Sequence, residues 1–209
     1  MQKPTFAHKG NTHMCKFSES TKRKLGNAIV YVARHTSNLS KTKLLKLLYL
    51  MEERMALKYH VPFIGIPYEV WQAGPVAKDV FVDISDGPFL LKDFIKTSYH
   101  DGGIFVEATT DFDDGEFSEC EIEMMDEVLA KYGSKTASEL VAETHKPGTL
   151  WYSEASRNGL LEAFKKRECN NSDLLIDFTE AMTACAAEYY RESLNIRQTA
   201  NLLNAESHV

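Results

Sequence analysis

The sequence predicts a mainly α fold of the α+β class, in which a compact helical domain carries a small β-hairpin or short sheet and is followed by a C-terminal helical extension. Three observations predict it. Apolar residues recur at helical spacing in two segments near the N-terminus, two capping-box patterns mark helix starts further on, and one tight-turn signal lies between extended runs. With 209 residues, 44% hydrophobic and 26% charged, the chain can bury a sizeable core.

Two long helices are predicted in the first third of the chain. The first begins at Ser20 and ends near Thr36, and its apolar positions recur every three or four residues: Leu25, Ala28, Ile29 and Val32. The second spans about residues 41–59, with Ser40 as its N-cap. Leucines lie on more than one side of this helix, so we expect it to be a central element. Residues 1–19 show no period of either kind and are expected to form a mobile N-terminal tail.

The middle of the chain predicts extended structure. Residues 62–75 are rich in β-branched and aromatic residues and are punctuated by proline and glycine, which predicts an extended segment. Pro75 is a favourable first residue for a short helix that Gly87 then ends. Residues 93–110 predict one β-hairpin, because Asp-Gly-Gly at 101–103 favours the positive backbone angles of a tight turn.

Two capping boxes predict the next two helix starts. Ser118 with Glu121, and Thr136 with Glu139, each place a capping hydroxyl three residues before a carboxylate that can reach back. Gly133 suits the left-handed residue that follows a helix end.

The last quarter of the chain is predicted to be helical. Thr149 can cap one further turn that holds Leu150 and Trp151. From Leu160 onward good helix formers dominate, so residues 158–209 are expected to form the C-terminal helical extension.

Charge is distributed unevenly along the chain. Residues 1–60 hold 12 basic and 3 acidic residues, whereas residues 61–209 hold 12 basic and 27 acidic ones, so the net charge of −6 divides into +9 and −15. A basic N-terminal half supports one alternative function, a regulator that contacts DNA or RNA through residues such as Lys22, Arg23 and Lys24. The overall acidity argues against it, and nucleic acid is not the partner we expect.

Several classes of protein are excluded by what the sequence lacks. No apolar run approaches the roughly 18 residues of a membrane span, and the N-terminus has no secretory signal. Four scattered cysteines do not form a disulfide framework. We therefore expect a cytoplasmic protein with reduced cysteines and no membrane partner.

Chemistry-bearing motifs are equally scarce. His8, His13 and Cys15 cluster without the paired spacing of a zinc site, and no phosphate-binding glycine loop or nucleophile elbow occurs. No metal and no cofactor is expected. A small enzyme would have to rely on His145, and catalysis needs more than one group. The alternative is that the ring nitrogens of His145 join two helices while Trp151 packs. We expect no enzymatic activity and no catalytic residues.

An acidic run occupies residues 107–127. No Lys or Arg occurs between Lys96 and Lys131, and ten acidic residues fall within residues 107–127. One interpretation is an ordinary solvated surface. The other is electrostatic steering, in which Asp113, Asp114 and Glu116 attract a basic partner protein.

Three sequence blocks carry a family resemblance. They are KTKLLKLLYLMEERMALKYH, EVWQAGPVAKDVF and YGSKTASELVAETHKPGTLW, in that order. Together the blocks resemble the Panacea domain family, which includes SocA-like antitoxins and phage-associated GepA-like proteins. The resemblance places the antitoxin domain at about residues 20–157. The matching positions are Lys43, Leu44, Lys46, Leu47, Leu48, Tyr49, Trp71, Gly74, Pro75, Val76, Phe81, Thr144, His145 and Trp151. Leu45 and Ala73 depart from the family pattern, which leaves the partner open.

The resemblance implies an antitoxin that neutralises a cognate toxin by direct protein binding. Some members also deliver the toxin to a AAA+ protease. The partner-binding candidates come from the family blocks and from the acidic run. They are Trp71, Pro75, His145 and Trp151, and Asp113, Asp114 and Glu116. The oligomeric state and the identity of the toxin stay open.

Overall fold

The computed structural model describes residues 17–206, with side chains as far as residue 200. This part of the chain forms eight α-helices, two 3-10 helices and two antiparallel two-stranded sheets. The prediction of a mainly α fold of the α+β class is confirmed. The elements are α1 (Glu19–His35), α2 (Lys41–Tyr59), β1 (Glu69–Trp71), β2 (Gly74–Val76), α3 (Lys78–Asp86), β3 (Ile95–His100), β4 (Gly103–Ala108), η1 (Asp114–Glu116), α4 (Glu119–Tyr132), α5 (Ala137–Thr144), α6 (Leu150–Arg157), α7 (Leu160–Lys165), η2 (Phe178–Ala181) and α8 (Ala184–Glu206).

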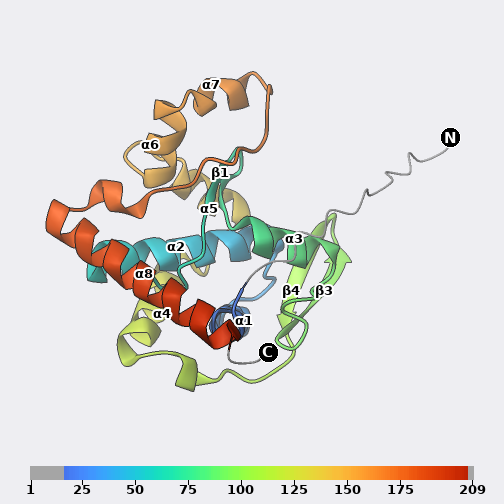
Figure 1. The fold of residues 1–209 in the computed structure, drawn as a ribbon. Coiled ribbons are helices and arrows are strands. Elements are labelled where there is room, and N and C mark those ends of the chain that lie inside the picture. The colour runs from blue at the N-terminus through green and yellow to red at the C-terminus, as the bar shows by residue number, and fades with distance from the viewer. Residues whose placement is uncertain (1–16, 207–209) are drawn as a thin grey trace.

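Helix α2 lies at the centre of the molecule (Figure 1). It contacts α1, α3, α4, α5, η2 and a strand of each sheet. Leu45 and Leu50 lie off its main apolar stripe and are nevertheless buried. The expected central position is therefore confirmed. Because α2 is covered on most sides, any polar group that it carries inward needs a partner inside the protein.

The helix starts predicted at Ser40, at the two capping boxes and at Thr149 form as expected. The side chains that accept a backbone N–H at a helix N-terminus are those of Ser18, Ser40, Ser118, Thr136 and Thr149. In both capping boxes the carboxylate of Glu121 or Glu139 accepts the backbone N–H of the capping residue in return. Residues 1–16 of the N-terminal tail expected over residues 1–19 lie outside the described residues. Phe17 packs against the core, and Ser18 already caps α1.

The predicted left-handed role of Gly133 is wrong. Gly133 has φ −63° and ψ −29°, which is right-handed helical geometry, and its N–H donates to the carbonyl oxygen of Leu129. A Cβ atom at this position would lie 2.6 Å from that same oxygen. Glycine is therefore needed here for a close backbone approach, not for a positive φ.

Residues 17–206 form two β-hairpins where one was predicted. The expected hairpin joins β3 to β4 through Asp101 and Gly102, whose φ angles of 50° and 75° fit the tight turn. The other joins β1 to β2, where Gly74 has φ 94° beside Trp71. Pro75 lies in β2, so its predicted position as the first residue of a helix is wrong. Helix α3 begins three residues later, after the strand pair has ended.

The prediction that the chain is helical from Leu160 onward is wrong in part, because the segment between α7 and η2 is not helical. Between α7 and η2 the backbone runs beside β1 instead. Val70 N–H donates to the carbonyl oxygen of Leu174, and Ile176 N–H donates to that of Tyr68. These bonds satisfy the outer edge of β1, so the segment is extended where local propensity favoured helix. Helix α8 then packs against η2 and against α1 (Figure 1).

Gly74 offers a stability test with a matched control. Gly74→Ala should lower the free energy of unfolding by about 2–5 kcal/mol, because left-handed strain adds to overpacking. The added Cβ would lie 2.8 Å from Thr144 Oγ1 and 2.9 Å from Lys46 Cε. Gly87→Ala has similar strain, with φ 89°, but meets nothing within 4 Å, so its loss should be only about 1–2 kcal/mol. Urea unfolding measures both, and equal losses would contradict the packing argument.

Candidate functional site: the junction of the three family blocks

The turn between β1 and β2 is the place where the three sequence blocks meet. Lys46 Nζ, from α2, donates to the carbonyl oxygen of Pro75 at 2.7 Å. Trp151 Nε1, from α6, donates to the carbonyl oxygen of Trp71 at 3.0 Å. One ring nitrogen of His145 lies 3.0 Å from the carbonyl oxygen of Gln72. Side chains from α2 and from residues 145–151, which run from the end of α5 into α6, thus bind the backbone of one short hairpin.

Lys46 is the most unusual member of this junction. Its side chain is 1% exposed, and burial lowers the pKa of its ammonium group to about 7. Its one hydrogen-bond partner among the described residues is the carbonyl oxygen of Pro75. Thr144 and His145 approach the same point, beside Gly74. The lysine therefore stabilises the hairpin as a buried donor.

His145 joins α5 to the hairpin. Nδ1 lies 2.6 Å from the carbonyl oxygen of Val141 and Nε2 faces that of Gln72. The ring also packs on Trp151, with 3.7 Å between centroids. Because both nitrogens face backbone carbonyl oxygens, neither is directed at a substrate in this conformation. The sequence-based alternative, a tie between two helices, is close to this arrangement, but one of the joined elements is a hairpin.

Trp71 is the tryptophan of the junction that reaches the surface. Its indole N–H donates to Glu69 Oε2 at 2.8 Å, and its ring packs edge-on against Phe81. Pro75 and Trp151, by contrast, lie in the interior. Of the four junction residues predicted to bind a partner, Trp71 and His145 are therefore the two with partly exposed surfaces.

The acidic run pairs extensively with the basic N-terminal half. Arg34 reaches Asp111 at 2.6 Å, and Arg54 and Lys58 both reach Glu127, at 2.9 and 2.6 Å. Arg23–Glu116 and Lys24–Glu121 are further pairs of the same kind. The uneven charge along the sequence is thus compensated within the fold. Glu116, which the sequence predicted to bind a partner, is therefore already paired with Arg23 of the same chain.

Four exposed carboxylates at η1 and in the first half of α4 remain without such a cation. Further along α4, Asp126 also has no cation of the described chain within ion-pair distance, and it accepts the hydroxyl of Tyr31. Asp113, Asp114, Glu119 and Glu123 are exposed, and none of them lies within ion-pair distance of a cation in the part of the chain that the structure describes. Asp113 accepts the backbone N–H of Gly115 at 3.0 Å. These carboxylates form an exposed negative surface over η1 and the first half of α4.

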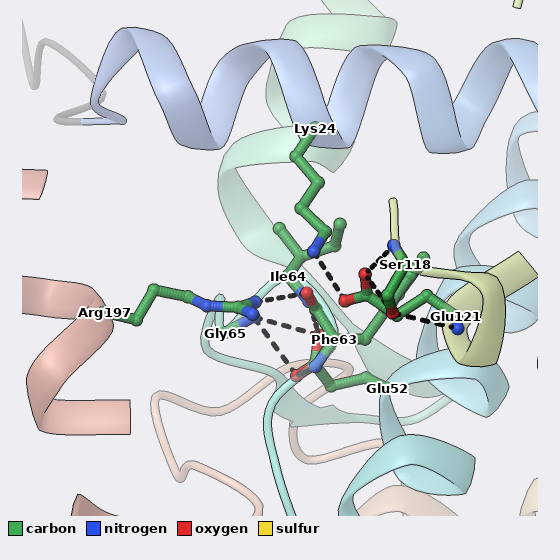
Figure 2. A network of polar contacts seen from close by, with 8 residues as sticks. All are labelled: Lys24, Glu52, Phe63, Ile64, Gly65, Ser118, Glu121 and Arg197. Carbon is green, nitrogen blue, oxygen red and sulfur yellow. Dashed lines mark hydrogen bonds and ion pairs between the residues drawn. The ribbon is translucent and has the colours of Figure 1, made fainter. Parts of the chain in front are cut away.

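A buried carboxylate of α2 was missed by sequence reasoning. Glu52 of α2 is 0% exposed and accepts the backbone N–H groups of Phe63, Ile64 and Gly65 at 2.9–3.1 Å (Figure 2). Burial raises its pKa, while these bonds and the nearby Arg197 act in the opposite direction. Arg197, from α8, donates to the carbonyl oxygen of Phe63. The signal was available, since Glu52 lies on the apolar stripe of α2.

The same network includes a pair between α1 and α4. Lys24 Nζ lies 2.5 Å from Glu121 Oε1, and both side chains are largely buried (Figure 2). Burial lowers the pKa of Lys24, and its bond to Glu121 opposes that change. Since Glu121 also closes its capping box, one carboxylate both starts α4 and fixes it to α1.

The model of the "Antitoxin SocA-like, Panacea domain" family matches residues 44–152, slightly more than half of the chain. The chain belongs to this family. No curated protein and no solved structure matches the chain significantly. The matched Panacea segment begins in α2 and ends in α6, so it contains the whole junction around the β1–β2 turn.

The described residues hold neither a membrane-spanning helix nor a metal-binding cluster. Over residues 17–206, no helix combines the length and the apolar character that crossing a membrane requires. No group of three or more His, Cys, Asp or Glu side chains in that range is arranged to hold a metal ion. The His8, His13 and Cys15 cluster lies outside the described residues.

Lys46 predicts a specific pH dependence. Its pKa in the folded protein, about 7, lies below the ordinary value of 10.5, so between these values the unfolded chain binds more protons. Its contribution to the free energy of unfolding should therefore rise with pH across that window, by up to about 1 kcal/mol per pH unit. Lys46→Met should remove that slope, as measured by urea unfolding from pH 7 to 9.5. The control variant Lys165→Met, at an exposed lysine, should show the same rise of the free energy of unfolding with pH as the wild type. A constant difference between wild type and Lys46→Met would contradict the argument.

Proposed function

We propose that this protein is an antitoxin that neutralises a cognate toxin by direct protein–protein binding in the cytoplasm. The observation that carries the proposal is membership of the SocA-like Panacea family. Antitoxin families act through regulation of a toxin, which supports a non-enzymatic role. The internal bonds of the junction agree with this, because His145 and Lys46 both serve the backbone of the hairpin.

The contact surface that we propose is the exposed negative surface over η1 and α4. Asp113 and Asp114 keep the role expected from the sequence, and Glu119 and Glu123 extend it along the helix. Exposed carboxylates without internal cations can steer a basic toxin surface during encounter. Glu116, paired with Arg23, would contribute less charge. Trp71 and His145 would act at the surface of the junction, and Pro75 and Trp151 would support it from the interior.

The nucleic-acid alternative has less support. Its proposed contacts, Lys22, Arg23 and Lys24, form ion pairs with acidic residues of the same chain. Cations that are already neutralised release fewer counterions on binding phosphate, so they would supply less affinity.

Co-expression with the product of the adjacent open reading frame tests the proposal. The chain should relieve the growth arrest that this product causes and should co-purify with it. If the toxin is also delivered to a AAA+ protease, its half-life should shorten when the chain is present, whereas sequestration alone should leave the half-life unchanged or longer. Continued growth arrest without co-purification would contradict the antitoxin assignment.

Charge reversal tests the proposed surface separately. Asp114→Lys combined with Glu123→Lys should slow association with the toxin about threefold to tenfold and flatten its dependence on salt, because steering is screened by ions. Glu162→Lys combined with Glu188→Lys makes the same change in net charge on other helices and serves as the control. Stopped-flow measurement at two ionic strengths gives the rates. Equal changes in the association rate for the two double variants would contradict the proposal that this surface steers the toxin.

A further inference from the structure

The outer edge of β1 is covered by a segment that lies outside the matched family domain. Residues 166–175 form a strap that follows α7 and passes beside β1 (Figure 1). The matched family segment, residues 44–152, contains β1 and ends before the strap. The edge of a strand presents backbone groups that bind another extended chain. The kind of occupant that this edge accepts is therefore visible in the protein itself: an extended segment.

The strap pairs imperfectly with β1. Val70 N–H donates to the carbonyl oxygen of Leu174 at 2.9 Å, as in a regular antiparallel ladder. Two residues along β1, Gln72 N–H donates to the carbonyl oxygen of Asn170, which lies four residues before Leu174, so the strap bulges between these two bonds. The carbonyl oxygen of Val70 accepts the hydroxyl of Ser172 at 2.7 Å in place of a backbone N–H. A regular strand would pair with this edge more completely than the strap does.

Side-chain packing holds the strap weakly. The buried residues Phe164 and Ile176 lie on either side of it, whereas every residue of the strap is exposed or only partly buried. Its ion pair, Asp173 with Lys78 at 3.2 Å, lies at the surface, where such pairs contribute little to stability. Segments with few buried apolar contacts open locally at low free-energy cost. The strap can therefore open between its two anchored ends while the rest of the fold stays closed.

We propose that an extended segment of the toxin displaces the strap and binds the outer edge of β1 as an added strand. Its backbone would accept the N–H groups of Val70 and Gln72 and would donate to the carbonyl oxygen of Val70. The inference rests on the proposed antitoxin function. It adds a contact beside Trp71, the partly exposed tryptophan of the junction. In the free protein the closed strap competes with the toxin for this edge.

Hydrogen exchange of the free protein tests whether the strap opens. The N–H groups of Val70 and Gln72 face the strap, whereas Trp71, whose register partner is Gly74, faces β2. Val70 and Gln72 should exchange about tenfold faster than Trp71, because the strap opens while β1 and β2 stay paired. Ser172→Ala removes one bond of the strap and should speed the exchange of Val70 about threefold further, with Trp71 unchanged. Equal protection of the three amides in the wild type would overturn the proposal.

The complex with the toxin tests the occupant. On binding, the protection of Val70 and Gln72 should rise about tenfold, because carbonyl oxygens of the toxin strand then accept their N–H groups. Cys169, partly buried in the strap, should react with iodoacetamide about fivefold faster as the strap leaves β1. Cys185, exposed on α8, serves as the control and should react at an unchanged rate. Unchanged protection, or raised protection with slower reaction of Cys169, would show that the strap stays on β1 and would overturn the proposal.

A disulfide lock tests the need for opening. Glu69 and Leu175 are the bridged pair between β1 and the strap, flanked by the backbone bonds on either side. In such a pair the Cα atoms lie about 4.5 Å apart, which a disulfide spans. With the four natural cysteines changed to serine, Glu69→Cys combined with Leu175→Cys should bind the toxin about tenfold more weakly when oxidised than when reduced, because the locked strap excludes the toxin strand.

A lock in the other hairpin is the matched control. Tyr99→Cys combined with Ile104→Cys joins register partners of β3 and β4 and should bind the toxin equally in both redox states. Equal affinity of the oxidised and reduced strap lock, or equal losses in both locks, would overturn the proposal. A disulfide-linked dimer of the strap lock on a non-reducing gel would show that the strap of a second copy occupies β1, and would also overturn it.

These results are separable from the function on which the inference rests. If the toxin binds the oxidised strap lock as tightly as the reduced form and the wild type neutralises it, the edge proposal fails and the antitoxin function stands. If the wild type fails to neutralise the toxin, the antitoxin function fails, and hydrogen exchange of the free protein still decides whether the strap opens.

Discussion

The fold depends on two ionisable side chains that the central helix carries into the interior. Lys46 donates to the backbone of the β1–β2 hairpin, and Glu52 accepts three backbone N–H groups from the segment that follows α2. Because a buried polar group without a hydrogen-bond partner is strongly unfavourable, each side chain fixes the position of the loop that satisfies it. A mostly apolar helix thereby specifies where two irregular segments lie, which apolar packing alone would not do.

This constraint explains how distant segments come together. Once Lys46 fixes the hairpin, its turn supplies the carbonyl oxygens that His145 and Trp151 bind, so α5 and α6 are positioned through the same backbone. Once Glu52 fixes residues 63–65, Arg197 of α8 reaches the adjacent carbonyl oxygen. Contacts therefore cross the boundary expected between residues 157 and 158, although the division into a family domain and an extension stays a prediction.

Electrostatics divides the surface into two kinds of region. Cations of the basic N-terminal half pair with carboxylates of the acidic run, which leaves a smaller negative surface at η1 and the start of α4. For a protein of an antitoxin family, this negative surface is where we propose that a basic partner binds.

The sequence by itself determined the helices whose signals are local. Periodicity gave the bounds of α2, and the capping boxes gave the starts of α4 and α5, because these patterns act within a few residues. It also gave the three family blocks. Only the tertiary structure decided what depends on distant partners: the hairpin at Gly74, the extended segment beside β1, and the internal pairing of Glu116. The burial of Pro75 and Trp151 is of the same kind, since burial is a property of what packs around a residue, which spacing along the chain does not record.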